Sequence, residues 1–403
     1  MPSHLPAGIV DLTDPDSFVG GIPVETFRRL RAEAPVVFHP ERDGPGFWVV
    51  SKWADVRSVS LDQATFSSWK AGIMIREMPR EREEMQREML TGMEPGRHGK
   101  HRRLVSGTFA PKIIRALEPR LRALVTRLLD DVGARGACDF VTDVACELLG
   151  VPIEDRAKIV TWSNAMIGVD DPEYADDPEA GPMAAMQLAM YAHELAERRR
   201  EDPRDDIVTE LLRAEVDGER LTPAEFNAFV LILAVAGNET TRNLISAGLW
   251  LLCEHPEERA RVQADLGLLP TAIDEMLRYH PPVLHFRRTA MRDVELRGER
   301  IREGDKVSLW YVSANRDEEV FPDADRFDVG RTPNDHLSFG FGPHFCLGSA
   351  LAHLEARVMF EELFQRLPDV ALAGPPVRLR ANHIHGIKHL PVRFTPERRR
   401  TTA

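Results

Sequence analysis

The chain has 403 residues, 43% of them hydrophobic, which is enough to bury one large core or two ordinary ones. A formal net charge of -12 argues against nucleic-acid binding, because the phosphate backbone attracts basic proteins. The longest apolar run, 228–237, is far shorter than the roughly 20 residues of a membrane-spanning helix, and the N-terminus has no apolar signal segment. These features predict a cytoplasmic protein without a membrane anchor.

The predicted secondary structure passes from a hairpin to helices and then back to strands. Apolar runs near 36–38 and 46–50, separated by a Gly/Pro turn, predict the hairpin. Helical periodicity dominates about 81–280, and Thr222-Pro-Ala-Glu225 predicts a capped helix that runs to about Cys253. We expect a single domain over 1–403 that is mainly α with a smaller β portion (α+β). The β portion covers about 35–60, 282–312 and 380–395, and the helical portion about 81–280 and 347–367.

One cysteine stands out by its surroundings. None of Cys138, Cys146, Cys253 and Cys346 belongs to a C-x-x-C pair, which argues against a structural zinc site. Cys346 lies in a Gly-rich turn immediately before a predicted helix, where the helix dipole and backbone N–H groups favour a thiolate. A buried cysteine that only packs as a small hydrophobe is the commoner case.

The turn Phe339-Gly-Phe-Gly-Pro-His-Phe-Cys346-Leu-Gly348 resembles the ligand loop of the cytochrome P-450 family, Phe-x-x-Gly-x-Arg/His-x-Cys-x-Gly. The resemblance extends from about Gly46 to Phe394. It implies haem b, held between a long central helix and this loop, with the Cys346 thiolate as the iron ligand. Phe339 and Gly348 then contact the cofactor, and a glycine at 348 lets a flat macrocycle approach the backbone. The chain shows no fused flavin or NAD(P)H site.

A second motif lies in the predicted long helix. Ala236-Gly-Asn-Glu239-Thr240 resembles the family's oxygen-binding signature. Cleavage of the O–O bond requires protons, so the resemblance implies that the Thr240 hydroxyl acts at the oxygen site and that the Glu239 carboxylate relays protons from solvent. Taken alone, the motif fits a buried helix with satisfied hydroxyls equally well.

Basic residues at family positions imply anchors for the two haem propionates, which need paired donors when buried. His98 and Arg102 have a spacing that places them on one helical face, and Arg288 and His344 complete the set by resemblance. A solvated basic face is the alternative for His98 and Arg102. Family positions also assign Glu275, Arg278 and Arg326 to a buried structural cluster behind the haem.

The substrate pocket is expected to be apolar and to hold its ligand largely by shape. The stretches 236–243, 285–290 and 386–394 are similar to those of actinobacterial members that oxidise steroid or branched-lipid side chains. Any of the pocket residues could also be ordinary core. The expected lining is Ile232, Ala236, Leu284 and Ile384, with Ile73 and Met74 as looser candidates and His285, His383 and His385 as candidate polar groups.

Electrons must come from another protein, which the resemblance identifies as a ferredoxin-type donor. A local basic face, Lys100, Arg103, Lys112 and Arg115, with Arg357 as a further member, is predicted to steer an acidic ferredoxin toward the thiolate side. The predicted activity is insertion of one oxygen atom of O2 into a hydrophobic small molecule. The alternatives are a peroxide-driven enzyme of the same fold, a non-catalytic haem protein and a haem-free helical binding module.

Overall fold

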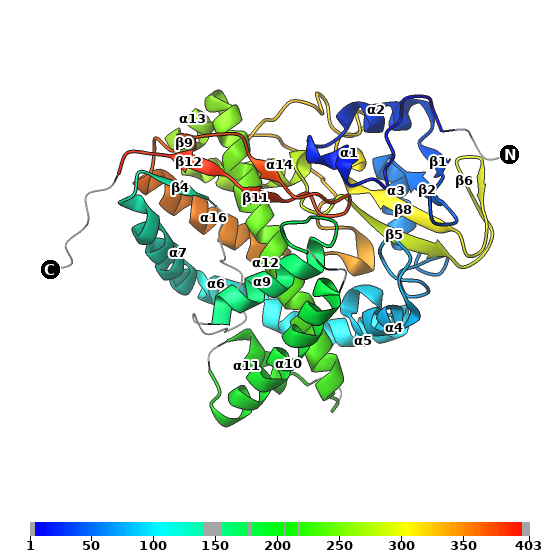
Figure 1. Cartoon of the computed structure of the whole chain (residues 1–403), viewed down its shortest axis with the longest axis horizontal. Coiled ribbons are helices and arrows are strands. Elements are labelled where there is room, and N and C mark those ends of the chain that lie inside the picture. The colour runs from blue at the N-terminus through cyan, green and yellow to red at the C-terminus, as the bar shows by residue number, and fades with distance from the viewer. Residues whose placement is uncertain are drawn as a thin grey trace.

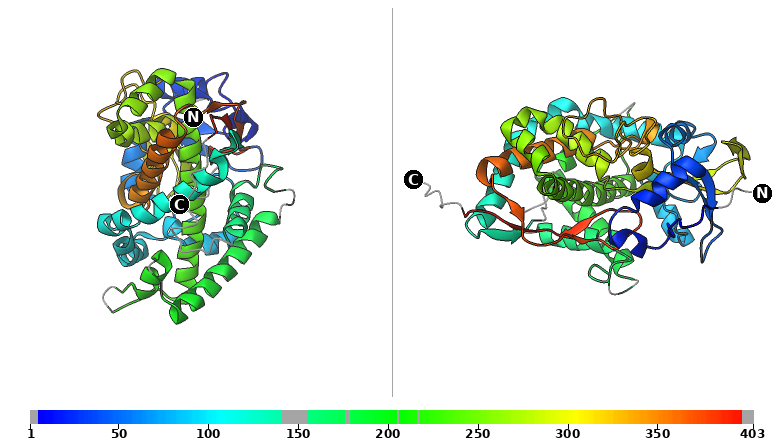
Figure 2. Two further views of the ribbon diagram at one scale, coloured as in Figure 1. Left: turned by 90° about the vertical axis from the view of Figure 1, so that its left-hand side faces the viewer. Right: turned by 90° about the horizontal axis from the view of Figure 1, so that it is seen from above.

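The computed structural model describes residues 5–140, 155–175, 177, 179–204, 206–215 and 218–396. Cys146 lies outside the described residues. Helices occupy most of the molecule, and the main sheet lies at the end that carries the N-terminus (Figure 1). One long helix runs through the middle and the others are arranged around it, as Figure 2 shows from two further sides.

The central helix, α12 (Pro223–Glu254), begins and ends close to the predicted residues. The Thr222 hydroxyl accepts the Glu225 N–H, and the Glu225 carboxylate accepts the Thr222 N–H, so both halves of the capping box form. The helix ends before Pro256, whose ring cannot continue the hydrogen-bond ladder. Within the described ranges, no helix is both long and apolar enough to cross a membrane.

The helices that surround α12 follow the expected helical stretches. Those that pack directly against α12 include α4 (Arg80–Glu88), α9 (Arg156–Ile167), α10 (Ala180–Glu201), α11 (Ile207–Arg213), α13 (Pro256–Ala264), α14 (Leu269–Tyr279) and α16 (Ser349–Arg366). The remaining α-helices of the described residues are α1 (Asp16–Val19), α2 (Val24–Glu33), α3 (Trp53–Leu61), α5 (Pro95–Ser106), α6 (Pro111–Ala116), α7 (Glu118–Gly133) and α15 (Tyr311–Ala314). The position of α3 corrects the expected β portion, which was given as about 35–60.

The main sheet has five strands in the order β1-β2-β8-β5-β3. The predicted hairpin pairs β1 (Val36–His39) with β2 (Phe47–Val50). Strand β2 runs parallel to β8 (Lys306–Trp310), which pairs antiparallel with β5 (His285–Ala290), and β5 pairs with β3 (Phe66–Ser67). The small sheets contain β4 (Ala137–Asp139), β12 (Pro391–Arg393) and β9 (Ala371–Leu372), then β10 (Val377–Arg378) with β11 (Ile387–His389), and β6 (Val294–Leu296) with β7 (Glu299–Ile301).

Strand β4 departs from the expectation, because it lies inside the stretch predicted to be helical. It has only three residues and no apolar alternation, with Ala137 and Asp139 exposed. Its pairing with β12 stabilises it, with Val392 opposite Cys138, and this partner lies about 250 residues further along the chain. A local pattern cannot reveal such a strand.

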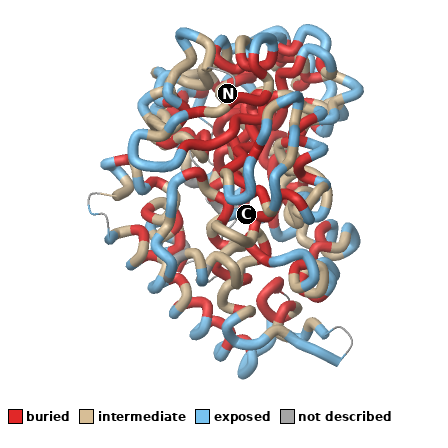
Figure 3. The backbone as a smooth tube through the Cα atoms, turned by 90° about the vertical axis from the view of Figure 1, so that its right-hand side faces the viewer, coloured by how far each residue is buried: buried red, intermediate tan, exposed pale blue. Residues whose placement is uncertain are grey.

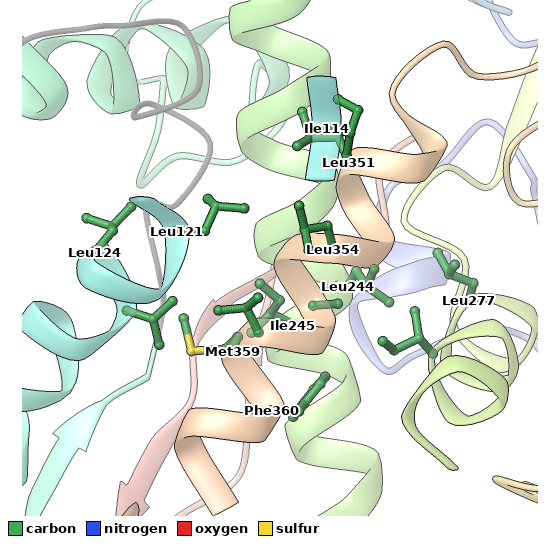
Figure 4. Packing of buried hydrophobic residues seen from close by; sticks show 14 of the residues in the cluster. Ile114, Leu121, Leu124, Leu244, Ile245, Leu277, Leu351, Leu354, Met359 and Phe360 are labelled. Carbon is green, nitrogen blue, oxygen red and sulfur yellow. The ribbon is translucent and has the colours of Figure 1, made fainter. Parts of the chain in front are cut away.

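The largest hydrophobic core is built around α12. In Figure 4, Leu244 and Ile245 of α12 lie beside Leu354 and Phe360 of α16, and Ile114 of α6 lies beside Leu351 at the start of α16. Buried residues fill the interior in Figure 3, whereas exposed residues follow the outward faces of the helices and the loops. This packing places the start of α16 opposite the middle of α12.

Glu275 and Arg278 form a buried ion pair at the centre of the predicted structural cluster, and neither side chain has any exposed surface. The Arg278 Nε and Nη2 atoms donate to Glu275 over 2.7 and 2.8 Å. The second arginine of the cluster is Arg331, whose Nε lies 3.1 and 3.2 Å from the two carboxylate oxygens.

The prediction for Arg326 was wrong. Its side chain is 63% exposed, and only its backbone carbonyl joins the cluster, as an acceptor from Arg278 and Arg331. The adjacent Phe327 takes the buried position, with 3% of its surface exposed, and the turn that precedes it, in which the Arg326 N–H donates to the Asp323 carbonyl, leaves the Arg326 side chain in solvent. Sequence reasoning therefore identified the Glu275–Arg278 pair, but it chose Arg326 where Arg331 is the second arginine of the cluster.

Four histidines lie in a buried layer where the segment after α14 meets the C-terminal loop. His280 stacks on His385 with ring centroids 3.8 Å apart, and His285 lies 5.0 Å from His383. Neither ring nitrogen of His280, His285 or His385 has a hydrogen-bond partner in the described structure. Burial lowers the pKa of His280 to about 3 and of His383 to about 4, and holds the pKa values of His285 and His385 well below 6.5.

Acid is expected to destabilise the protein through these histidines. Because their folded pKa values are lowered, the unfolded chain binds more protons below pH 6.5, so stability falls as pH drops from 6.5 toward 4. Each histidine contributes about 1.4 kcal/mol per pH unit in that window. Urea unfolding should therefore show a shallower loss for His385→Asn than for wild type, and no change for exposed His193→Asn. Equal slopes in wild type and His385→Asn would contradict this expectation.

Candidate active site

The loop before α16 is held tightly by its own backbone. The Cys346 N–H donates to the Phe339 carbonyl over 2.8 Å, and a short 3-10 turn, η5 (Gly342–His344), lies between them. Gly342 has φ +71°, and a Cβ at this position would lie 3.1 Å from Leu61 and 3.3 Å from a backbone carbonyl oxygen. Only glycine fits this turn without strain.

Cys346 is half-buried in the wall of a large cavity. Burial raises the pKa of its thiol, and the backbone N–H groups of Gly348 and Ser349, together with Arg102, offset only part of that rise. The expected amide contacts to sulfur are therefore present, but they do not by themselves make the thiolate the favoured form. A bound metal cation would supply the missing stabilisation.

The cavity extends between the cysteine loop and α12. Its empty space, including the part open to solvent, is about 1620 Å³. Cys346, Phe339 and Gly348 line one part of it, and the middle of α12 lines another. A ligand in this cavity would therefore lie between the cysteine loop and the central helix.

Four predicted basic anchors meet at this cavity, although they come from three separate segments. His98 and Arg102 lie on α5, Arg288 on β5 and His344 on η5, and all four line the cavity. The His98 and His344 rings are 4.2 Å apart, and the Ser68 hydroxyl lies 3.3 Å from His344 Nε2. Burial is the largest cause that lowers the pKa of His98 to about 4 and of His344 to about 2.

These anchors lack a negative partner. His98 Nε2 has no hydrogen-bond partner, and Arg288 donates only to the carbonyl of Arg287. In the described part of the chain, no carboxylate pairs with Arg102 or Arg288, and burial lowers the pKa of both. A buried guanidinium group without a counter-ion costs folding free energy, so this part of the cavity favours the binding of an anion. Two propionates would meet that need, and the residues therefore fit haem.

The oxygen-motif residues divide between the two sides of α12. Ala236, Gly237 and Thr240 line the cavity, and the Thr240 hydroxyl donates to the Ala236 carbonyl within the helix. A Cβ at Gly237 would meet no heavy atom within 4 Å, so this turn of the helix faces open space. A small polar niche thus lies in a largely apolar wall.

Glu239, by contrast, points away from the cavity. Its carboxylate is 1% exposed and pairs with Arg242, while Asn243 lies within hydrogen-bond distance. Arg242 also donates to Asn164 of α9 over 3.1 Å. As a carboxylate held outside the cavity, Glu239 could reach it only if the ion pair with Arg242 opened.

Only some of the residues expected to contact the substrate lie at the cavity. Ile73, Ile232 and Ala236 line the cavity. Leu284 does not: it is fully buried in the core near the N-terminus, beside Trp310. Ile384 and Met74 are also absent from the described lining.

An isolated bridge joins Val283 to Ile384 and sets how these two segments face each other. Val283 lines the cavity, as do Phe286 and Arg288 of β5, whereas Ile384 packs with Val283 in a small separate hydrophobic cluster. His285, His383 and His385 do not line the cavity and lie in the buried histidine layer.

Several cavity residues were missed by sequence reasoning. Thr241 directly follows the recognised threonine, and Glu355 lies four residues after Leu351 and three after Ala352, which line the cavity from the same face of α16. The spacing of seven residues from Gly348 to Glu355, two helical turns, could have drawn attention to Glu355. No sequence signal identifies the remaining missed positions, which include Thr91, Phe229, Leu244, Val283, Phe286 and Tyr311.

The predicted basic face lies close to the start of α16. Arg103, Lys112 and Arg115 are exposed, and α6, which holds the last two, packs against α16. Lys100 is paired with Glu219. Arg357 is tied into ion pairs with Glu118 and Glu361, and is therefore a weaker member of this face.

Comparisons with known proteins agree with this geometry. The Cytochrome P450 family model matches residues 183–368. A steroid C26-monooxygenase of Rhodococcus jostii is 42% identical, over 97% of this chain and 86% of the relative. A methyl-branched lipid omega-hydroxylase of Mycobacterium tuberculosis is 42% identical, over 92% of this chain and 90% of the relative. The solved structure of a Mycobacterium marinum cytochrome P450 in complex with pseudoionone has a TM-score of 0.89 and 36% identity, over 97% of this chain and all of that chain.

Proposed function

Because this chain belongs to the cytochrome P450 family, we propose that it hydroxylates a steroid or a methyl-branched lipid on its alkyl chain, with Cys346 as the thiolate ligand of its haem. Family membership makes the protein a haem-thiolate monooxygenase that uses O2, a lipophilic substrate and a separate electron donor. The substrate class rests on the names of the relatives and on an apolar cavity lining that includes Ile73, Phe229 and Ile232.

One observation supports the residue assignments above all others. Cys346 and the four basic anchors line the same cavity, and the anchors have no negative partner there. In the proposal, the propionates are bound by the four basic anchors, His98, Arg102, Arg288 and His344. The porphyrin ring contacts Phe339 and Gly348. When bound, the haem supplies activation of dioxygen and transfer of one oxygen atom to the substrate.

In the proposal, residues of the chain transfer protons to the site and exclude water from it. Thr240 Oγ1 both donates and accepts, so it can hold a proton at the cavity face of α12. Glu239 would relay protons from the other side of the helix, after its ion pair with Arg242 opens. Ile232 and Ala236 keep the surrounding wall apolar and limit the entry of water.

Substrate turnover with isotopically labelled oxygen tests this proposal. The holoenzyme, supplied with ferredoxin, ferredoxin reductase and NAD(P)H, should add one ¹⁸O atom from ¹⁸O₂ to a steroid side chain or a branched lipid chain. Equal turnover with hydrogen peroxide alone would favour the peroxide-driven alternative. Absence of product with both substrate classes would overturn the substrate assignment. The cytoplasmic location remains a prediction that cell fractionation would test.

The electron donor is proposed to dock on the basic face next to α16. The double variant Lys112→Glu/Arg115→Glu should slow reduction by ferredoxin roughly tenfold at low salt and weaken the salt dependence, because steering charges are reversed. Stopped-flow reduction kinetics measure this effect. A matched control, Arg204→Glu/Arg213→Glu, makes the same change in net charge at exposed sites elsewhere. Equal rates in the docking variant and the control would exclude this docking face.

A further inference from the structure

A second carboxyl group, Glu355 of α16, lies in the wall of the cavity. Its side chain is 1% exposed, and its Oε1 atom has no hydrogen-bond partner in the described structure. Thr241 of α12 lines the same cavity, and its hydroxyl hydrogen-bonds with Glu355. A buried carboxyl group and a hydroxyl thus connect the two helices that face each other across the site.

No positive charge compensates Glu355 among the described residues. Burial raises the pKa of this carboxyl to about 8, and the hydrogen bond with Thr241 offsets only part of that rise. The charged groups on the helices packed against α16 pair with other residues or are exposed. Asp274 of α14 pairs with His336 and His353, and Glu239 of α12 pairs with Arg242. On α7, Glu118 pairs with Arg357, and Arg122 pairs with Glu361 and Glu362, whereas Lys112 and Arg115 of α6 are exposed.

Glu355 and Glu239 therefore differ in their partners and in their positions. Glu239 lies outside the cavity and is paired with Arg242. Glu355 lies in the cavity wall without a cation, which favours its neutral form. A neutral carboxyl group can donate a proton, and its bond with Thr241 links it to the residue next to Thr240.

We propose that Glu355 is a redox-linked proton store of the haem site, exchanging its proton with the cavity through the Thr241 hydroxyl. This proposal rests on the proposed function, because it assumes that a redox-active haem occupies the cavity. One electron from the ferredoxin-type donor adds negative charge to the site. Where Glu355 is ionised, one proton from water then binds its carboxylate oxygen and restores the local charge.

Infrared difference spectroscopy of the holoenzyme tests whether Glu355 holds a proton. At pH 7, wild type should show a buried carboxylic C=O band that shifts in D2O, is lost in Glu355→Gln and fades as pH rises through about 8. Thr241→Val should shift the band without abolishing it. Glu361→Gln is the matched control, since Glu361 is on the same helix but pairs with arginines, and it should leave the band unchanged.

The reduction potential provides the second measurement. In wild type the potential should fall as pH rises through about 8, because an ionised Glu355 opposes the added electron. Glu355→Gln should flatten the curve in this range, and Glu361→Gln should not. If Glu355→Gln is poorly folded, Thr241→Val tests the same link, since it should move the midpoint of the pH dependence.

Either of two results would overturn the proposal that Glu355 stores a proton. The first is the absence of a Glu355-dependent band at pH 7, and the second is the same dependence of potential on pH in wild type and Glu355→Gln. These failures are distinct from failure of the proposed function. A loss of the thiolate spectrum would count against Cys346, and a lack of hydroxylated product would count against the substrate, whereas neither affects the carboxyl band.

Discussion

The Glu275→Ala variant is expected to lose about 3–5 kcal/mol of stability, because it leaves a buried Arg278 without its negative partner. That loss is a large part of the 5–15 kcal/mol that separates most folded domains from their unfolded chains. Urea unfolding followed by circular dichroism measures it, if the variant folds at all. Glu84→Ala removes an exposed ion pair with Arg80 and should cost less than about 1 kcal/mol.

A second comparison tests which arginine completes the cluster. Arg331→Ala removes charged hydrogen bonds to Glu275 and should cost about 1.5–3 kcal/mol. Arg326→Ala should be close to neutral, within about 0.5 kcal/mol, since its side chain is exposed. The reverse order of these two effects would restore the original assignment of Arg326.

Replacing Thr240 by alanine is expected to separate electron use from product formation. The hydroxyl at the cavity face of α12 is lost, while the anchors and Cys346 are untouched, so the haem spectrum should not change. General acid–base groups typically contribute 10²–10⁴-fold, so product formed per NAD(P)H should fall by about tenfold or more, and hydrogen peroxide should rise. Thr240→Ser retains a hydroxyl and should keep most of the coupling. Wild-type coupling in Thr240→Ala would remove Thr240 from the mechanism.

The features that sequence reasoning predicted well are those encoded within a short stretch. The loop around Cys346 and the capping box at Thr222 have their partners within ten residues, so spacing alone specifies their geometry. His98 and Arg102 share a helical face for the same reason. The family resemblance added Arg288 and His344 to His98 and Arg102, and in the folded chain these four residues line one cavity.

The features that were missed depend on contacts between distant segments. Whether Val283 or Leu284 faces the cavity is decided by the bridge to Ile384, about 100 residues away, and a shift of one residue exchanges the two faces. Burial raises the pKa of Glu355, and its hydrogen-bond partner Thr241 lies more than 110 residues earlier in the chain. Glu239 pairs with Arg242 only three residues away, but Arg242 is itself held by Asn164, which lies 78 residues earlier in the chain. Local patterns contain none of this information.

The absorption spectrum of the reduced, carbon-monoxide-bound protein tests the central claim, ligation of haem by Cys346. Wild type is predicted to show the red-shifted Soret band of a thiolate ligand, and Cys346→Ala is predicted to lack it, while Cys253→Ala, at a cysteine away from the cavity, should keep it. A red-shifted band that persists in Cys346→Ala, or its absence from haem-loaded wild type, would contradict the account.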